Sequence, residues 1–246
     1  MEDWNHLLYL SGNDIPFREA GLNICQPRIK DIALLGEDSF YAGVEFLKFD
    51  KDILAIEDKT HLENKSNFEV LIAIMNEKNL TIQTQKLQVT MVLALLFPEH
   101  SIEIKRDCIS LKKQGQEYQI NDSNFENFKK ILKHMFCLDG KDNGDDYNPS
   151  GRMAQQIAEK LKKRHQRISQ EKEPNKKISI LERYVSVLAV GEQKDINSLL
   201  DYTVYQLFDE LKRYQLKVAW DLTLKARMAG AKDMKDAEDW MKDLHS

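Results

Sequence analysis

A few histidine, cysteine and acidic side chains have spacings that could suit a metal ion. The loop starting at Asp139 has the Asn-Gly pair of an EF-hand at positions 5 and 6. It places Lys141 at position 3 and Ser150 at position 12, where calcium loops need an oxygen ligand and a Glu. His134 and Cys137 lie one helical turn apart, but structural zinc needs four ligands and no second pair has matching spacing. We therefore expect no metal ion and no cofactor.

Motifs of covalent and phosphate chemistry are missing from the sequence. It contains no GxSxG, no Gly-rich loop ending in Lys-Ser or Lys-Thr, no GxGxxG and no HExxH. Carboxylates are numerous, but a single sequence does not show which of them share a pocket. We expect no enzymatic activity and no catalytic residues.

Positive charge is concentrated between Gly151 and Lys177. This segment has nine basic and three acidic side chains, a net charge of +6, in a chain of net charge −4. It could attract nucleic acid or an acidic protein surface, or it could be a solvated helix that carries Lys and Arg for solubility alone. The candidate basic patch comprises Arg152, Lys160, Lys163, Arg164 and Arg167. Residues 195–214 also have a weak helix-turn-helix pattern. The acidic Asp209 and Glu210 in its second helix disfavour the recognition of bases, so nucleic acid is an unfavoured partner.

Methionine and aromatic side chains are frequent near the C-terminus. These residue types are enriched in protein interfaces, although packing in a helical core explains many aromatic residues equally well. An amphipathic piece after Gly230 reads as a detached tail. We therefore predict partner contacts through Met228, Met234, Trp240, Met241 and Leu244.

The composition is typical of a soluble, ordered protein, with 246 residues, 42% hydrophobic and 31% charged. Three scattered cysteines without a CxxC pair argue against a secreted disulfide framework. The N-terminus lacks the basic region of a signal peptide. The most apolar stretch, Val89–Phe97, is much shorter than the about 20 residues of a membrane helix. We expect a cytoplasmic protein without membrane contact.

Apolar periodicity predicts a mainly α-helical fold in two parts. Residues 1–138 form an N-terminal helical domain with a small antiparallel β hairpin or meander, residues 139–150 a polar linker, and residues 151–246 a C-terminal helical domain. The N-terminal elements are an extended run at 7–10, helices at 29–47 (interrupted at Gly36), 68–75 and 87–97, strands at 101–105, 110–112 and 118–120, and a helix from 123.

The last of these helices is predicted to begin at an N-cap cluster, residues 121–123, with a capping box between Ser123 and Glu126. In the C-terminal domain, helices are predicted at 151–171, 178–190 and from 204 onward, with a short turn at 196–200. Apolar residues recur at 3-4 spacing in the last one, as expected of a packing seam: Val204, Leu207, Leu211, Tyr214 and Val218.

Several stretches are similar to one known group of proteins. They are Gln26–Ala33 followed by Gly36-Glu37, Tyr147–Gly151, Thr203–Asp209 with Arg213-Tyr214, Ala226–Lys232, and Asp239–Lys242. Together they resemble phage and prophage tail assembly chaperones.

The resemblance implies a non-enzymatic protein that keeps the long, helical tape-measure protein soluble while tail-tube subunits polymerise around it. It implies no catalytic residue. Two alternatives stay open: a structural component of the tail or head–tail connector, which would be found in the virion, and a nucleic-acid-binding module that uses residues 151–177. Self-association is also left open.

Overall fold

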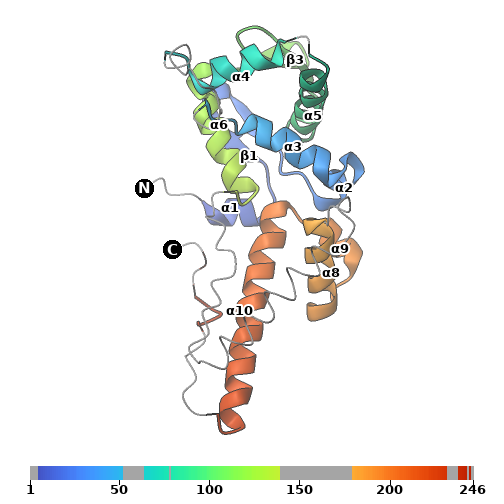
Figure 1. Cartoon of the computed structure of the whole chain (residues 1–246), viewed down its shortest axis with the longest axis vertical. Coiled ribbons are helices and arrows are strands. Elements are labelled where there is room, and N and C mark those ends of the chain that lie inside the picture. The colour runs from blue at the N-terminus through green and yellow to red at the C-terminus, as the bar shows by residue number, and fades with distance from the viewer. Residues whose placement is uncertain are drawn as a thin grey trace. The chain divides into compact units, whose positions relative to one another are not determined.

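The computed structural model describes residues 5–51, 64–77, 79–138, 179–231, 238–242 and 244 (Figure 1). The mainly α-helical fold with a small antiparallel sheet is confirmed, and a second, two-stranded sheet is added to it. The described elements are α1 (His6–Leu10), β1 (Ile15–Phe17), the 3-10 turn η1 (Arg18–Ala20), β2 (Leu22–Ile24), α2 (Ile29–Leu35), α3 (Glu37–Leu47), α4 (Asn67–Met75), α5 (Leu80–Leu96), β3 (Ser101–Ile104), β4 (Ile109–Lys113), β5 (Gln116–Ile120), α6 (Asp122–Met135), α8 (Ile180–Glu192), α9 (Ile196–Leu200) and α10 (Val204–Met228).

The chain divides into two compact units. Unit 1 consists of Met1–Asp139 and Val185–Asp209, and unit 2 of Gly140–Tyr184 and Glu210–Ser246. Unit 1 therefore takes in α8 from Val185 onward, α9 and the start of α10 in addition to the predicted N-terminal domain. The predicted linker at 139–150 and the predicted helix at 151–171 lie outside the described residues.

The first elements of unit 1 differ from the prediction. The run at 7–10 was expected to be extended, but it is the helix α1, because the Asn5 side chain caps it by accepting a hydrogen bond from the Leu8 amide at 3.2 Å. Strands β1 and β2 form an antiparallel hairpin that the sequence analysis missed. Each has only three residues and β1 contains Pro16, so neither gives a strand pattern in the sequence.

Helices α2 and α3 are separated at Gly36, which lies inside the periodic pattern and where the sequence predicted a kink or a tight contact. This residue has φ +90°, which glycine adopts without the steric cost of a Cβ. Helix α3 then packs closely along α5 at Gly43. A Cβ at position 43 would lie 2.7 Å from Val92 Cγ2 and 2.8 Å from the Gln88 carbonyl oxygen, so only glycine permits this approach.

Side-chain caps set where α4 and α5 begin. Ser66 and Glu69 form a reciprocal capping box at the start of α4. Helix α5 starts at Leu80, seven residues earlier than predicted, because Asn79 caps it by accepting a hydrogen bond from the Thr81 amide. The predicted helix at 87–97 is therefore only the second half of a 17-residue helix.

Strands β3, β4 and β5 form the predicted antiparallel meander in that order. Cross-strand partners include Ile104 with Ile109 and Leu111 with Tyr118. On β5, Glu117 accepts hydrogen bonds from Lys105 Nζ at 2.6 Å and from the Ser110 hydroxyl. These two donors, the ammonium first, lower the pKa of Glu117 to about 2.

Helix α6 begins at the predicted N-cap cluster, with Asn121 as its N-cap. Asn124 rather than Glu126 completes the capping box, so the predicted box of Ser123 and Glu126 is wrong. Glu126 instead accepts hydrogen bonds from Asn67 and from the buried Lys129, at 2.9 and 2.8 Å. The hydrogen bond from Asn67 at the start of α4 to this carboxylate holds α6 against α4.

Aromatic rings fill much of the core of unit 1. Phe128 of α6 contacts Phe17 of the first hairpin and Phe97 at the end of α5, with ring centroids 5.7 and 6.1 Å apart. Phe40 of α3 meets Phe136 edge to face at 5.1 Å. These contacts tie helices and hairpin together through side chains that are at most 1% exposed.

The turn between α9 and α10 is held to the start of α2 within unit 1. The Ile29 amide donates to the Tyr202 carbonyl at 2.8 Å, and Arg28 and Thr203 form an isolated antiparallel bridge. Lys30 Nζ lies 2.6 Å from Asp201 Oδ1. These contacts join residues about 170 positions apart in the chain, which explains why unit 1 includes Val185–Asp209.

Candidate functional site

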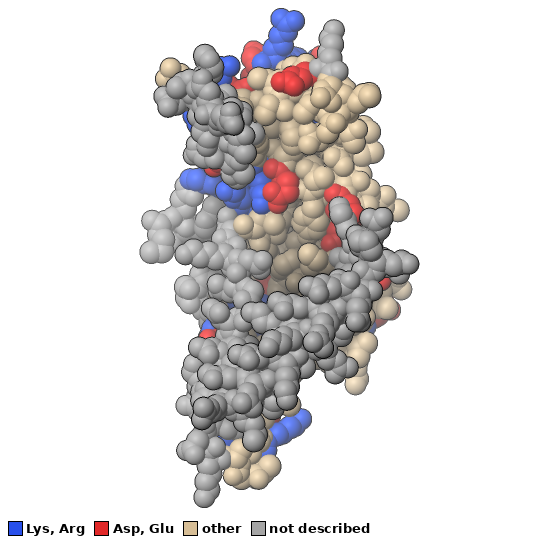
Figure 2. All heavy atoms as spheres, in the orientation of Figure 1, with Lys and Arg blue, Asp and Glu red and all other residues tan. Residues whose placement is uncertain are grey.

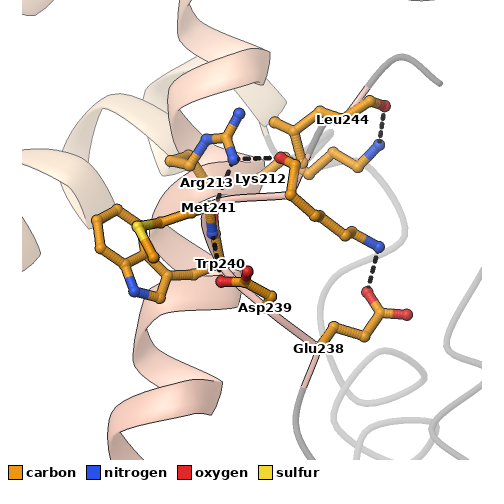
Figure 3. Close-up of polar contacts among 8 residues, drawn as sticks. Lys212, Arg213, Glu238, Asp239, Trp240, Met241 and Leu244 are labelled. Atoms are coloured by element: carbon orange, nitrogen blue, oxygen red, sulfur yellow. Dashed lines mark hydrogen bonds and ion pairs between the residues drawn. The ribbon is translucent and has the colours of Figure 1, made fainter.

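The C-terminal segment, residues 238–242 and 244, lies against α10 within unit 2 (Figure 3). Arg213 Nη1 donates to the carbonyl oxygens of Trp240 and Lys242, each at 2.7 Å. Lys212 Nζ donates to the Leu244 carbonyl at 3.3 Å. The segment was predicted to be a detached tail, and the structure instead holds it to α10 through three backbone carbonyls.

The segment also differs from the predicted amphipathic piece in conformation. Residues 238–242 and 244 form turns and bends rather than a helix. The Asp239 side chain accepts from the Met241 amide at 2.9 Å, and Lys242 Nζ pairs with Glu238. Such local side-chain to backbone bonds compete with helix formation and favour a turn.

The five residues predicted to contact a partner lie in different environments. Leu244 is buried and Trp240 is half-buried, whereas Met241 and Met228 are 69% and 81% exposed. Met234 lies outside the described residues. A partner in contact with the folded chain could therefore reach Met228 and Met241 directly, while Leu244 is already covered.

The second half of α10 presents apolar side chains, of which the sequence analysis singled out Met228 as a partner contact. We call Trp220, Leu224 and Met228, which are 38%, 50% and 81% exposed, the α10 patch. Trp220, Leu224 and Met228 are spaced four residues apart and so share one side of the helix. The 3-4 seam that was predicted is buried at its start (Val204, Leu207 and Leu211) and only half-buried at Tyr214 and Val218.

Charged residues surround the α10 patch. Lys217, Lys225 and Arg227 are basic and Asp221 is acidic. Lys225 and Arg227 lie in the last turn, where cations offset the partial negative charge of the helix C-terminus. An apolar surface bordered mainly by cations suits a protein partner whose own apolar face is flanked by acids.

His134, which was considered with Cys137 for metal binding, lies in a cluster of rings in unit 1. The His134 ring centroid is 4.5 Å from that of Tyr9, 5.1 Å from His6 and 5.5 Å from Tyr205. His6 Nδ1 is 3.0 Å from the Tyr205 hydroxyl. Within the described ranges, no three His, Cys, Asp or Glu side chains are grouped so that they could hold a metal ion.

The thiols have the chemistry of packed rather than reactive cysteines. Burial raises the pKa of Cys25, and the adjacent Asp14 raises it further. Burial also raises the pKa of Cys108. Since the thiolate is the nucleophile, both side chains are held in their unreactive form near neutral pH.

Two further predictions concern charge and membranes. All members of the candidate basic patch (Arg152, Lys160, Lys163, Arg164 and Arg167) lie outside the described residues.

Of the helices that the structure describes, none has the length and apolar content that a membrane span requires.

Comparison with known proteins links the C-terminal part of the chain to a phage family. Residues 171–245, less than a third of the chain, match the family model described as the YomV second domain. The comparison with curated proteins and the comparison with solved structures each gave no significant match. The matched range contains α8, α9, α10 and the C-terminal segment. YomV is a prophage protein, so these residues are similar to a domain of a phage-derived protein.

Proposed function

We propose that this chain is a non-enzymatic phage tail-morphogenesis protein that binds helical segments of the tape-measure protein during tail assembly. The observation that carries the proposal is the α10 patch, which exposes three large apolar side chains along about two turns of one side of the helix. Exposed apolar clusters of this kind mark binding sites, because they gain free energy when a partner removes them from water.

The form of the patch favours a helical partner. Side chains at i, i+4 and i+8 (Trp220, Leu224 and Met228) make an apolar line along α10. An amphipathic helix can lay its own apolar face along such a line. The cations beside the patch would pair with acidic residues at the edges of that partner helix.

The C-terminal segment would extend the contact. Arg213 fixes the backbone of this segment through two hydrogen bonds, and Met241 stays 69% exposed on it. Because the segment is ordered before the partner arrives, little conformational entropy is lost on binding. Methionine adapts its shape to different apolar surfaces, which suits a protein that must hold many segments of one long helix.

Two other lines of support agree with this assignment. The YomV second-domain match covers α10 and the C-terminal segment and points to a phage protein. The stretches quoted above resemble tail assembly chaperones in particular. Neither identifies the partner, so the tape-measure protein, the tail-tube subunits and a chaperone role in the host cytoplasm are parts of the proposal.

The test is co-expression of the full chain with the tape-measure protein of the same phage, followed by co-purification and measurement of the affinity. The double variant Trp220→Ala/Leu224→Ala should lower the affinity about 100-fold, since each truncation of an interface anchor costs about 1–2 kcal/mol. The matched control is Leu34→Ala on α2, whose side chain is 89% exposed but lies outside the α10 patch. This control should bind as the natural chain does.

Three outcomes would contradict the proposal. One is undiminished co-purification of the double variant. Another is the recovery of fixed copy numbers of the chain from purified virions, which would favour a structural component of the tail or connector. The third is tight, salt-dependent retention of DNA by the chain, which would favour the nucleic-acid module at 151–177.

A further inference from the structure

Helix α5 has a second apolar face that unit 1 does not cover. Its buried residues (Val89, Val92, Leu93 and Leu96) pack into the core of unit 1. On the opposite side, Leu80, Leu87 and Met91 are 86%, 56% and 40% exposed, and Thr84 and Ala94 are exposed as well. We call these five exposed residues the α5 stripe.

The spacing of the α5 stripe is that of a coiled-coil seam. Positions 80, 84, 87, 91 and 94 are separated by 4, 3, 4 and 3 residues, which places Leu80, Leu87 and Ala94 at d positions and Thr84 and Met91 at a positions. The stripe runs nearly the full length of the helix, which is about 25 Å. Another helix with a matching seam can pack along an exposed seam of this length.

The positions that flank the α5 stripe carry no charge. The e positions are Thr81, Gln88 and Leu95, and the g positions are Gln83 and Thr90. Lys86 is the one charged residue in α5, and it lies at a c position. In Figure 2 the surface at the upper right, where α5 and α3 lie in Figure 1, is almost entirely tan.

The uncharged positions beside the α5 stripe favour a second copy of α5 as the helix that packs on it. Coiled-coil pairs that join different chains commonly choose their partner through opposite charges at e and g. The α5 flanks offer a charged partner helix no ion pair, whereas a second α5 would bring only uncharged Gln, Thr and Leu side chains against them. A two-fold axis would place the same surface on both sides of the contact.

We therefore infer that two copies of this chain associate through their α5 stripes, with Leu87 near the centre of the contact. This association is independent of the proposed function, because the α10 patch belongs to another helix and the dimer forms without a phage partner. It gives the chain a self-complementary surface of aliphatic and methionine side chains, separate from the cation-bordered α10 patch.

The experiment is sedimentation velocity on the full chain, purified alone, over a concentration range of about 1–100 μM. The natural chain should sediment as a dimer that dissociates on dilution. Leu87→Glu, which places two like charges near the axis, should raise the dimer dissociation constant at least about tenfold. Leu34→Glu, at an exposed leucine outside the α5 stripe, should leave that constant unchanged.

A mixing experiment separates the stripe from any effect on folding. Leu87→Glu and Leu87→Lys should each be mainly monomeric with natural helical content by circular dichroism, and their equimolar mixture should regain the dimer. Three results would overturn the inference: a natural chain that is monomeric throughout the range, a dimer that survives Leu87→Glu, or a mixture that stays monomeric.

Discussion

The close approach of α3 and α5 at Gly43 makes Gly43→Ala the sharpest test of the fold. In an isolated helix this substitution would stabilise, because alanine is favoured over glycine by about 1 kcal/mol. In the folded chain the new methyl group would lie 2.7 Å from Val92 Cγ2 and 2.8 Å from the Gln88 carbonyl oxygen. We therefore expect the packing cost to exceed the helical gain.

The size of the effect follows from which atoms must move. Overpacking a core commonly costs about 1–3 kcal/mol. The upper part of that range applies here, because two of the three nearest atoms belong to the Gln88 backbone and no rotamer change can withdraw them. Subtracting the helical gain leaves a net loss of about 2 kcal/mol in the free energy of unfolding, or a fall in Tm of about 4–8 °C for a chain of this size.

Urea and thermal unfolding followed by circular dichroism would measure this loss. The matched control is Ala42→Gly at the neighbouring, exposed position, which should lose only the helical preference of about 1 kcal/mol. If helical preference governed both sites, the two substitutions would shift the stability in opposite directions. A Tm that rises in Gly43→Ala would refute the close approach of α3 and α5.

Four other substitutions test particular contacts. The carboxyl of Glu117 should titrate with a pKa of about 2, and Lys105→Met should raise that pKa, as followed by NMR of the side-chain carbon. Because this pKa is lowered from 4.5, the stability that the carboxylate contributes is complete above pH 4.5 and is lost as the pH falls from there towards 2. Ser66→Ala removes the cap of α4 and should cost about 1 kcal/mol in urea unfolding. Lys129→Met should change the stability by less than about 1 kcal/mol, whereas Glu126→Gln should cost about 1–2 kcal/mol in the same assay, because it leaves the buried ammonium without its counter-charge.

Local patterns predicted the elements whose signal is contained in a few neighbouring residues. The alternation around Ile102, Ile104 and Leu111 identified the meander, and the Gly36 interruption identified the boundary between α2 and α3. The prediction failed where one polar side chain decides the outcome. Asn5 turns an apolar run into α1, and Asn79 starts α5 seven residues early.

The candidate surfaces were predicted only in part, for a related reason. Sequence periodicity shows that a helix has an apolar face, but it does not show whether another element covers that face. Leu244 is covered and Met228 is exposed although both were predicted to contact a partner. The α5 stripe was missed because the helix is apolar on both faces, so its exposed heptad is hidden among core positions. Contacts such as Lys30 with Asp201 join distant positions, and a single sequence contains no information on such pairs.

The way in which Arg213 holds the C-terminal segment has a consequence for variation among phages. Its guanidinium donates to the main-chain oxygens of residues 240 and 242, which every amino acid has. These hydrogen bonds therefore do not depend on the side chains at those positions. Substitutions there can alter what is offered to the surroundings without loosening the anchor. Single replacements at positions 240 and 242 can therefore change the side chains that the segment exposes, while the two hydrogen bonds to Arg213 are kept.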